Sequence, residues 1–209
     1  MARGDLELAK RDLESAVAGG HRVARVDLGR LLSQPSSGPA DVQRAVALYE
    51  RAWADGVSVA GFELGSLYER GTATASDGHN EPGARMSQAW AWFRRAADVG
   101  EPNALARIGD EKVGTALTSG ATTAARSTNL LDAFYYYAVA AERARIENWP
   151  DDAWSRWRYR RASLARFLAR EGMASDVVVI FTKSLADAHR QADTDFVRRS
   201  RQRTDRIVR

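Results

Sequence analysis

The amino-acid sequence predicts an all-helical protein built from repeated helix pairs. Alanine and glycine recur at regular intervals over the first 144 residues. A second short pattern follows each of the first three copies at a constant distance. The apolar residues in both patterns have the spacing of one face of an α-helix. From these observations we expect nine or ten helices and no strand.

The first pattern is "AKRDLESAVAGG" from Ala9, and it has three further copies downstream. It recurs as "AVALYERAWADG", "AWAWFRRAADVG" and "AFYYYAVAAERA", which begin at Ala45, Ala89 and Ala133. The copies are separated by 36, 44 and 44 residues. The first three end in glycine, where a helix favours a left-handed cap, and the fourth has Ala144 at that position.

The second pattern begins four residues after each closing glycine, as "ARVDLG", "AGFELG" and "ALARIG" from Ala24, Ala60 and Ala104. Because this offset is constant, we expect a tight turn between the two helices. The additional residues fall in 71–84 and 114–129, which are rich in Gly, Ser, Thr and Asn and are therefore predicted to be loops. Small alanines let helices approach closely while large side chains fill the core. The residues that we expect to be buried in this way are Leu28, Leu48, Leu64, Tyr68, Trp92, Phe93, Tyr136 and Tyr137.

These motifs resemble the Sel-1-like repeat family, which is related to the tetratricopeptide repeats. "AGFELGSLYERG" (60–71) matches the first half of the family motif, and "AWAWFRRAADVG" (89–100) matches the second with Phe93 in place of Tyr. The resemblance covers roughly residues 5–144. It departs from the family in the two longer loops, in Pro35 and in Lys112, which replaces a Tyr. The resemblance implies a short right-handed α-solenoid of stacked antiparallel helix pairs that acts as an adaptor and not as a catalyst.

The repeat pattern is lost after residue 144, and residues 145–209 are expected to form a divergent pair of capping helices in the same domain. The first should follow Pro150, carry Asp151 and Asp152 in its first turn, and end at Gly172. The second should begin near Ser175. Its run Val177–Phe181 has the composition of a buried strand, but a helix is expected because a single strand would have no partner. The last segment, "RRSRQRTDRIVR", holds six arginines and one acid and is expected to fray or to form an exposed helix end.

Tryptophan and arginine occur together in the first of these two helices, and both are enriched at protein interfaces. Trp154, Trp157 and Arg161 share one side of the helix, and Tyr159 points away from them. We therefore expect an exposed part of a partner-binding surface within residues 149–172, with sealing of the end of the repeat array as the alternative. The candidate binding residues are Trp149, Trp154, Trp157, Arg158, Tyr159 and Arg161.

Composition restricts the other functional classes. The chain has 209 residues and a net charge of +4, with a net charge of −2 in residues 1–150 and +6 in residues 151–209. It has no cysteine, and therefore no disulfide or thiolate metal site. No apolar run approaches the roughly 18 residues of a membrane span. The beginning of the chain has no signal-peptide core, so either the protein is not exported or a leader was removed. These features fit a cytoplasmic protein and also a periplasmic one.

The sequence contains no catalytic or cofactor motif. Its three histidines, His21, His79 and His189, lack metal-ligand spacing, and no phosphate-binding glycine loop is present. We therefore expect no enzyme activity, no metal and no cofactor. The leading hypothesis is a protein-binding adaptor of a bacterial envelope, exopolysaccharide-export or secretion system. The alternatives are an immunity protein that neutralises a secreted toxin and, less favoured, binding of nucleic acid or another anionic surface through the arginine-rich C-terminus.

Overall fold

The computed structural model describes residues 3–73, 81–118 and 120–207 of the chain. Within these ranges all regular secondary structure is helical, as predicted, and comprises nine α-helices. The chain divides into two compact units, residues 1–95 (unit 1) and 96–209 (unit 2), which are described separately below. The change in sequence pattern at residue 144 falls inside unit 2, near the end of one long helix.

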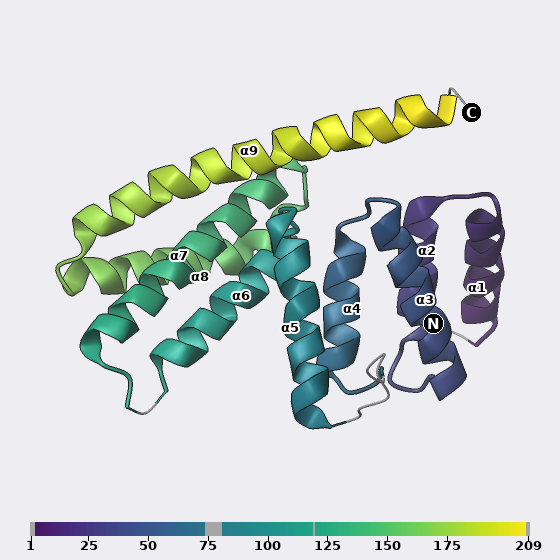
Figure 1. Cartoon of the computed structure of the whole chain (residues 1–209), viewed down its shortest axis with the longest axis horizontal. Coiled ribbons are helices and arrows are strands. Elements are labelled where there is room, and N and C mark those ends of the chain that lie inside the picture. Colours follow the sequence, from purple (N-terminus) through teal and green to yellow (C-terminus); the bar gives the residue numbers. More distant parts are fainter. Residues whose placement is uncertain (1–2, 74–80, 119, 208–209) are drawn as a thin grey trace. The chain divides into compact units, whose positions relative to one another are not determined.

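Unit 1 contains five helices joined mostly by short turns, and neighbouring helices run in opposite directions (Figure 1). Helix α2 packs against α1 and α3, and α3 packs against α4. The helices are α1 (Arg3–Ala18), α2 (Arg22–Leu32), α3 (Pro39–Ala54), α4 (Val59–Glu69) and the part of α5 (Pro82–Asp98) that precedes residue 96.

A contact between glycine and an aromatic ring recurs inside unit 1. A Cβ atom added to Gly29 on α2 would lie 2.5 Å from Cε1 of Tyr49 on α3. A Cβ added to Gly65 on α4 would lie 2.5 Å from Cε1 of Phe93 on α5. Both glycines close the "ARVDLG"-type pattern, and both rings occupy the same position of the first pattern. The absence of a side chain therefore lets each ring lie directly on the neighbouring helix backbone.

Most of the residues predicted to be core are buried. In the two units Leu28, Leu64, Tyr68, Phe93 and Tyr137 are at most 3% exposed. Leu48, Trp92 and Tyr136 are only partly buried. Trp92 packs edge-on against Trp53, with ring centroids 5.8 Å apart. The aromatic residues at 90–93 thus contribute mainly to the hydrophobic core of unit 1.

The repeated glycines end their helices in the same way. Gly20, Gly56 and Gly100 have φ angles of 83°, 82° and 82°, which is the left-handed conformation predicted for them. The next amide then donates to the carbonyl of the repeated alanine, at 3.0 Å from His21 to Ala16, 2.9 Å from Val57 to Ala52 and 2.9 Å from Glu101 to Ala96. This turn explains why the offset between the two sequence patterns is constant.

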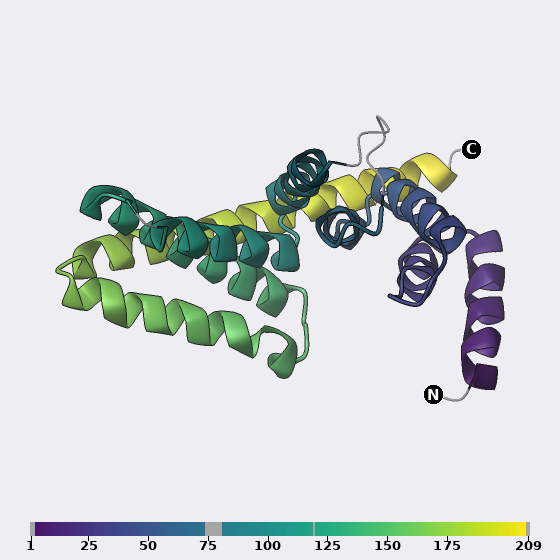
Figure 2. The ribbon, with the colours of Figure 1, turned by 90° about the horizontal axis from the view of Figure 1, so that it is seen from below.

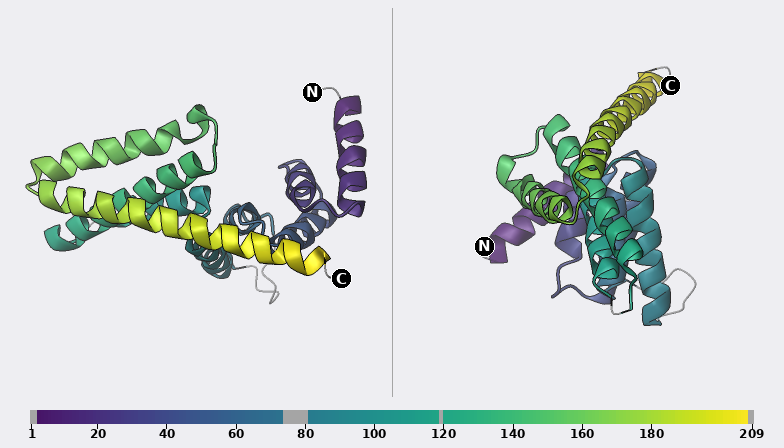
Figure 3. Two further views of the ribbon diagram at one scale, coloured as in Figure 1. Left: turned by 90° about the horizontal axis from the view of Figure 1, so that it is seen from above. Right: turned by 90° about the vertical axis from the view of Figure 1, so that its left-hand side faces the viewer.

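Unit 2 is built around helix α7, and its longest helix is α9 (Figure 2). Helix α7 packs against each of the other three, and α8 also packs against α9. The two C-terminal helices form a long hairpin (Figure 3). The helices are α6 (Pro102–Ala116), α7 (Thr123–Ile146), α8 (Asp151–Arg170) and α9 (Ala174–Ile207). The glycine–aromatic contact occurs here once, because a Cβ on Gly109 would lie 3.0 Å from Cε1 of Tyr137.

The loop predicted over residues 114–129 is confirmed only in its central part, residues 117–122, of which the structure describes all but residue 119. Helix α6 continues to Ala116 and α7 begins at Thr123, where Thr122 accepts a hydrogen bond from the Ala125 amide at 3.2 Å. Some of the polar residues that suggested a loop, among them Thr128 and Asn129, lie in the first turns of α7. Thr128 and Asn129 donate to helix carbonyls four residues earlier, at 3.0 and 2.9 Å. Such bonds allow these residue types on an exposed helix face.

The fourth copy of the repeat ends one helical turn later than the other three. Ala144, at the glycine position, lies inside α7, and Asn148 takes the left-handed conformation with a φ angle of 60°. The Trp149 amide donates to the Ala144 carbonyl at 3.0 Å, which repeats the turn of the first three copies. Asparagine tolerates this conformation better than most residues that have a side chain.

The predicted helices of the C-terminal third are confirmed, including α9 across Val177–Phe181. The backbone of α9 is helical to Ile207. The side chains of the arginine-rich segment 198–209 lie outside the described residues, as do residues 74–80 of the predicted loop 71–84.

Candidate partner-binding face of helix α8

Helix α8 is delimited by residues that suit its two ends. Pro150 is the N-cap, and Asp151 and Asp152 lie in the first turn, where the helix dipole favours negative charge. At the other end Gly172 has a φ angle of 84°, and the Met173 amide donates to the Leu168 carbonyl at 2.9 Å. Between these ends one face of α8 is buried and the opposite face is exposed, so the helix has distinct inner and outer faces.

The inner face of α8 carries Trp154 and Trp157, two of the residues that we expected in an exposed binding surface. Trp157 is 2% exposed and Trp154 is 8% exposed. The Trp154 indole donates to the Trp149 carbonyl at 3.3 Å, and the rings of Trp149 and Trp157 lie 5.9 Å apart. The predicted exposure of Trp154 and Trp157 is therefore wrong. The large apolar area of each ring is more stable removed from water within unit 2.

Two other predicted residues do lie on the outer face. Tyr159 is 70% exposed and points away from the two tryptophans, as the helical spacing indicated. Arg158 is exposed, and its guanidinium carbon lies 5.0 Å from the Trp154 ring centroid. Trp149 is partly buried, and Arg161 is partly buried beneath the surface. The structure therefore divides the six predicted residues between the interior of unit 2 and its surface.

The outer face also includes residues that the sequence interpretation missed. Each of them lies three, four or seven residues from Tyr159 or from another member of the group, which places them on one face of the helix. This spacing could be read from the sequence. We define the α8 outer face as Arg156, Arg158, Tyr159, Arg166, Phe167 and Arg170, all of which are exposed.

The four arginines of the α8 outer face have no carboxylate partner among the described side chains. Arg156 and Arg158 stack on tryptophan rings. The guanidinium carbon of Arg156 lies 5.5 Å from the Trp157 ring centroid, and that of Arg158 lies 5.0 Å from the Trp154 ring centroid. Arg166 donates to the Ser163 hydroxyl at 3.4 Å. Stacking orients a guanidinium group but does not neutralise it. The outer face therefore presents uncompensated positive charge.

The neighbouring arginines of α8 are used inside unit 2. Arg160 forms an ion pair with Asp110 of α6 and lies 3.4 Å from the Tyr137 hydroxyl, which itself donates to Asp110 at 2.5 Å. Burial, followed by the Asp110 carboxylate, raises the pKa of Tyr137. Arg161 lies over the Phe181 ring at 4.9 Å, and burial and the nearby Arg158 lower its pKa. These two arginines fix α8 on its neighbours.

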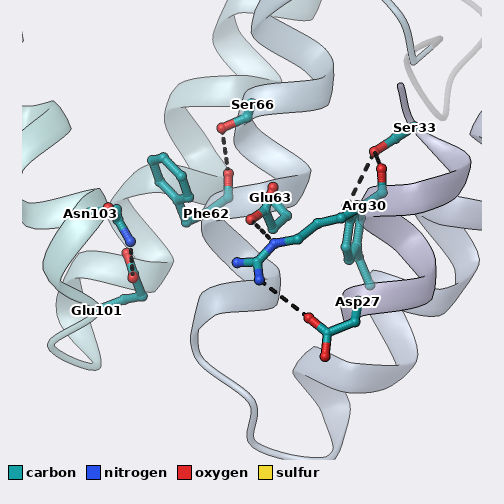
Figure 4. Close-up of polar contacts among 9 residues, drawn as sticks. Asp27, Arg30, Ser33, Phe62, Glu63, Ser66, Glu101 and Asn103 are labelled. Atoms are coloured by element: carbon teal, nitrogen blue, oxygen red, sulfur yellow. Dashed lines mark hydrogen bonds and ion pairs between the residues drawn. The ribbon is translucent and has the colours of Figure 1, made fainter. Parts of the chain in front are cut away.

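Unit 1 contains a comparable polar link between its repeat helices. Arg30 on α2 donates to Glu63 on α4 at 2.7 Å and lies 3.4 Å from Asp27 (Figure 4). Burial raises the pKa of the nearby Tyr49 to about 12. Arg30 follows Gly29 directly, and Asp110 follows Gly109 directly. In both units the residue that follows this glycine therefore forms an ion pair with another helix. That residue is the cation, Arg30, in unit 1 and the anion, Asp110, in unit 2.

Exposed apolar side chains gather at the end of unit 2 where α8 turns into α9. Phe167 is 44% exposed, and Val178 and Val179 on the first two turns of α9 are 65% and 66% exposed. The interior at this end is closed by Ala116, Leu130 and Leu168. Arg166, Phe167 and Arg170 of the α8 outer face lie at this same end, and arginine and aromatic side chains are enriched at protein interfaces.

No model of a known protein family matches the chain, and no curated protein matches it. Across the described ranges, none of the helices has the length and apolar character needed to cross a membrane.

Proposed function

We propose that this chain is a non-catalytic protein-binding module that docks an acidic segment of another protein on the α8 outer face. The observation that carries this proposal is the set of four arginines without a described carboxylate partner beside the exposed Tyr159. Carboxylates of a partner would pair with the guanidinium groups, and apolar residues of the partner would cover Tyr159 and Phe167.

A protein partner accounts for more of this surface than a nucleic acid does. Arginine and tyrosine suit both kinds of partner. The apolar side chains of Phe167, Val178 and Val179 lie at the same end of unit 2 and suit only a protein or another apolar surface.

The proposed architecture is a short right-handed α-solenoid of the Sel-1-like type. Its support is the recurrence of the packing glycines Gly29, Gly65 and Gly109 with their aromatic rings, together with the repeated left-handed turns. Repeat proteins of this kind bury a core between adjacent helix pairs and use exposed helix faces for binding. The adaptor role follows from this proposed architecture and from the α8 outer face.

The test is selection of peptides from a display library that varies Asp, Glu, Leu and Phe positions, with the full chain as bait. We expect enrichment of peptides with several carboxylates and at least one large apolar residue. The double variant Arg158→Glu/Arg166→Glu should weaken binding of a selected peptide by at least about tenfold, because each reversal replaces attraction with repulsion. The matched control is Arg51→Glu, an exposed arginine on α3, which should leave the affinity within about twofold.

Two results would overturn the proposal. One is a library that yields no preference for acidic peptides. The other is a selected peptide that binds the double variant as tightly as the unaltered chain. A parallel titration with single-stranded DNA tests whether the α8 outer face binds nucleic acid instead. DNA binding that falls steeply with added salt and is abolished in the double variant would assign this face to nucleic acid.

A further inference from the structure

Helix α1 at the start of unit 1 has one side that is packed and one side that is exposed. It packs against α2, with Leu13 and Val17 against the core of the unit. Glu14 also pairs with Arg44 of α3 at 2.9 Å. The exposed residues on the other side are spaced three or four apart and therefore lie along one face. We define the α1 outer face as Asp5, Leu8, Ala9, Asp12 and Ser15, all of which are exposed.

The repeat shows that this side is covered in the other copies of the first pattern. Ala9 begins the first copy, and Ala45, Ala89 and Ala133 begin the other three. Those three alanines are 0% exposed, whereas Ala9 is exposed. Each of the three later copies also places an aromatic ring on the packing glycine of the preceding helix. In the described part of the chain the corresponding side of α1 has no such cover.

The α1 outer face is acidic and mostly small. Asp5 and Asp12 carry its charge, and they lie about two helical turns apart. Leu8 is 58% exposed, and its neighbour Ala9 leaves the helix backbone accessible to a larger side chain. The face therefore combines negative charge, one large apolar side chain and room beside it.

The two cations in the middle of α1 do not cancel this charge. Lys10 is half-buried on the packed side of the helix. Arg11 borders the α1 outer face and lies four residues after Glu7, a spacing at which opposite charges attract. Glu7 therefore offsets Arg11, and the two aspartates determine the charge of the face.

The α8 outer face has the opposite properties. Its four arginines have no described carboxylate partner, and Tyr159 and Phe167 are 70% and 44% exposed. Large side chains on one helix fit over small side chains on another, and opposite charges favour the pairing. The two helices are also similar in length, with 16 residues in α1 and 20 in α8.

We propose that the acidic segment bound by the α8 outer face is the α1 outer face of a second molecule of this protein. The inference rests on the function proposed above, because it names the partner of that same surface. Asp5 and Asp12 pair with arginines of α8, and the aromatic rings of α8 cover Leu8 and Ala9. Because the two surfaces differ, the contact is head-to-tail, and each added molecule leaves one surface of each kind open for another.

The test of self-association is sedimentation velocity of the full chain at low salt, over a concentration range of about 10 µM to about 1 mM. We expect the average mass to rise above that of one chain as the concentration increases. Added salt should reverse the rise, because it screens charges that are exposed at the edge of the contact.

Two charge-reversed variants identify the surfaces. Arg158→Glu/Arg166→Glu makes the α8 outer face more acidic, and Leu8→Arg/Asp12→Arg makes the α1 outer face basic. Self-association of each variant alone should be weaker by at least about tenfold. An equimolar mixture should associate again, because the unaltered α1 outer face of the first variant meets the unaltered α8 outer face of the second.

The matched control for the α1 variant is Ala47→Arg/Glu50→Arg, which makes the same change in charge at two exposed positions of α3. It should leave self-association within about twofold of the unaltered chain. Circular dichroism of every variant checks that its helices are retained, so that a loss of association is not a loss of folding.

Three results would overturn this inference: an unaltered chain that stays monomeric at the highest concentration, a variant that self-associates as the unaltered chain does, or a mixture that does not recover. A control that weakens association as much as the α1 variant also overturns it, because the effect would then follow net charge. The peptide selection separates the two proposals. If the α8 outer face binds selected acidic peptides while the chain remains monomeric, the proposed function stands and only the second molecule is excluded.

Discussion

Unit 1 and the end of unit 2 bury aromatic residues in two different ways. In unit 1 a ring lies on a helix backbone where a glycine leaves room, as Tyr49 does on Gly29 and Phe93 on Gly65. Unit 2 repeats this contact once, with Gly109 and Tyr137, and then α8 seals the unit with the side chains of Trp154 and Trp157. The first arrangement requires glycine at a fixed position, whereas the second requires large side chains on one helix face.

This difference explains why the repeat motif disappears without loss of helical packing. The inner face of α8 fills its space with the indole rings of Trp154 and Trp157, and α8 contains no glycine. Polar cross-links persist in both regions, as Arg30–Glu63 in unit 1 and Arg160–Asp110 in unit 2. The sequence motif therefore reports one particular kind of close contact and not the fold as a whole.

The largest expected effect is at Trp157. Trp157→Ala should lower the free energy of unfolding by about 3–5 kcal/mol, because it leaves a large cavity beneath α8. Tyr159→Ala, two residues away on the outer face, should change stability by less than about 0.5 kcal/mol. Urea unfolding of both variants measures the comparison. Equal stability losses would show that the two faces of α8 are not energetically distinct.

The second effect distinguishes the turns of the two units by their pH dependence. The residue after the left-handed glycine is His21 or Val57 in unit 1 and the buried Glu101 in unit 2. Glu101 accepts from the Ala104 amide at 2.6 Å and from Asn103 at 2.9 Å, the latter contact drawn in Figure 4. Burial raises its pKa from 4.5 to about 7, and the hydrogen bonds oppose this shift.

Because the pKa of Glu101 is higher in the folded state, the folded protein retains a proton that the unfolded chain loses between pH 4.5 and about 7. The contribution of Glu101 to the free energy of unfolding is therefore fully present below pH 4.5. It decreases by about 3 kcal/mol as the pH rises to about 7. Glu101→Gln should flatten this decline, measured as urea midpoints at pH 5 and pH 8. Glu171→Gln, exposed at the end of α8, is the control and should retain it.

The third effect tests the glycine contacts directly. Gly65→Ala places a methyl group against the Phe93 ring and should cost about 1–3 kcal/mol. Gly109→Ala, where the ring is 3.0 Å from the added atom instead of 2.5 Å, should cost less. Gly114→Ala, in α6 with nothing near its Cβ, should stabilise the helix by about 0.5–1 kcal/mol. If Gly65→Ala also stabilised the protein, the contact with Phe93 would not be a constraint.

The sequence predicted the helices and most of the repeat core because both depend on local periodicity. Gly56 and Gly100 were placed correctly in their turns for the same reason. The exposure of Trp154 was predicted wrongly because amphipathic spacing identifies a face but not its direction. The ion pair of Arg160 with Asp110 could not be predicted, because the two residues meet only through the packing of separate helices. The polar start of α7 resembled a loop because its hydrogen bonds to helix carbonyls cannot be read from composition.

The smallest expected effect concerns the turn that ends α7. Asn148 has a φ angle of 60° where the earlier copies have glycine, and the surrounding hydrogen bonds are the same. Glycine adopts this conformation without steric cost, although it also adds freedom to the unfolded chain. Asn148→Gly should therefore stabilise the protein by a few tenths of a kcal/mol, and Asn148→Ala should destabilise it by about 1 kcal/mol. Thermal melts of the two variants should move in opposite directions. If both lowered the melting temperature equally, the asparagine side chain would be making a specific contribution that the glycines of the earlier copies do not share.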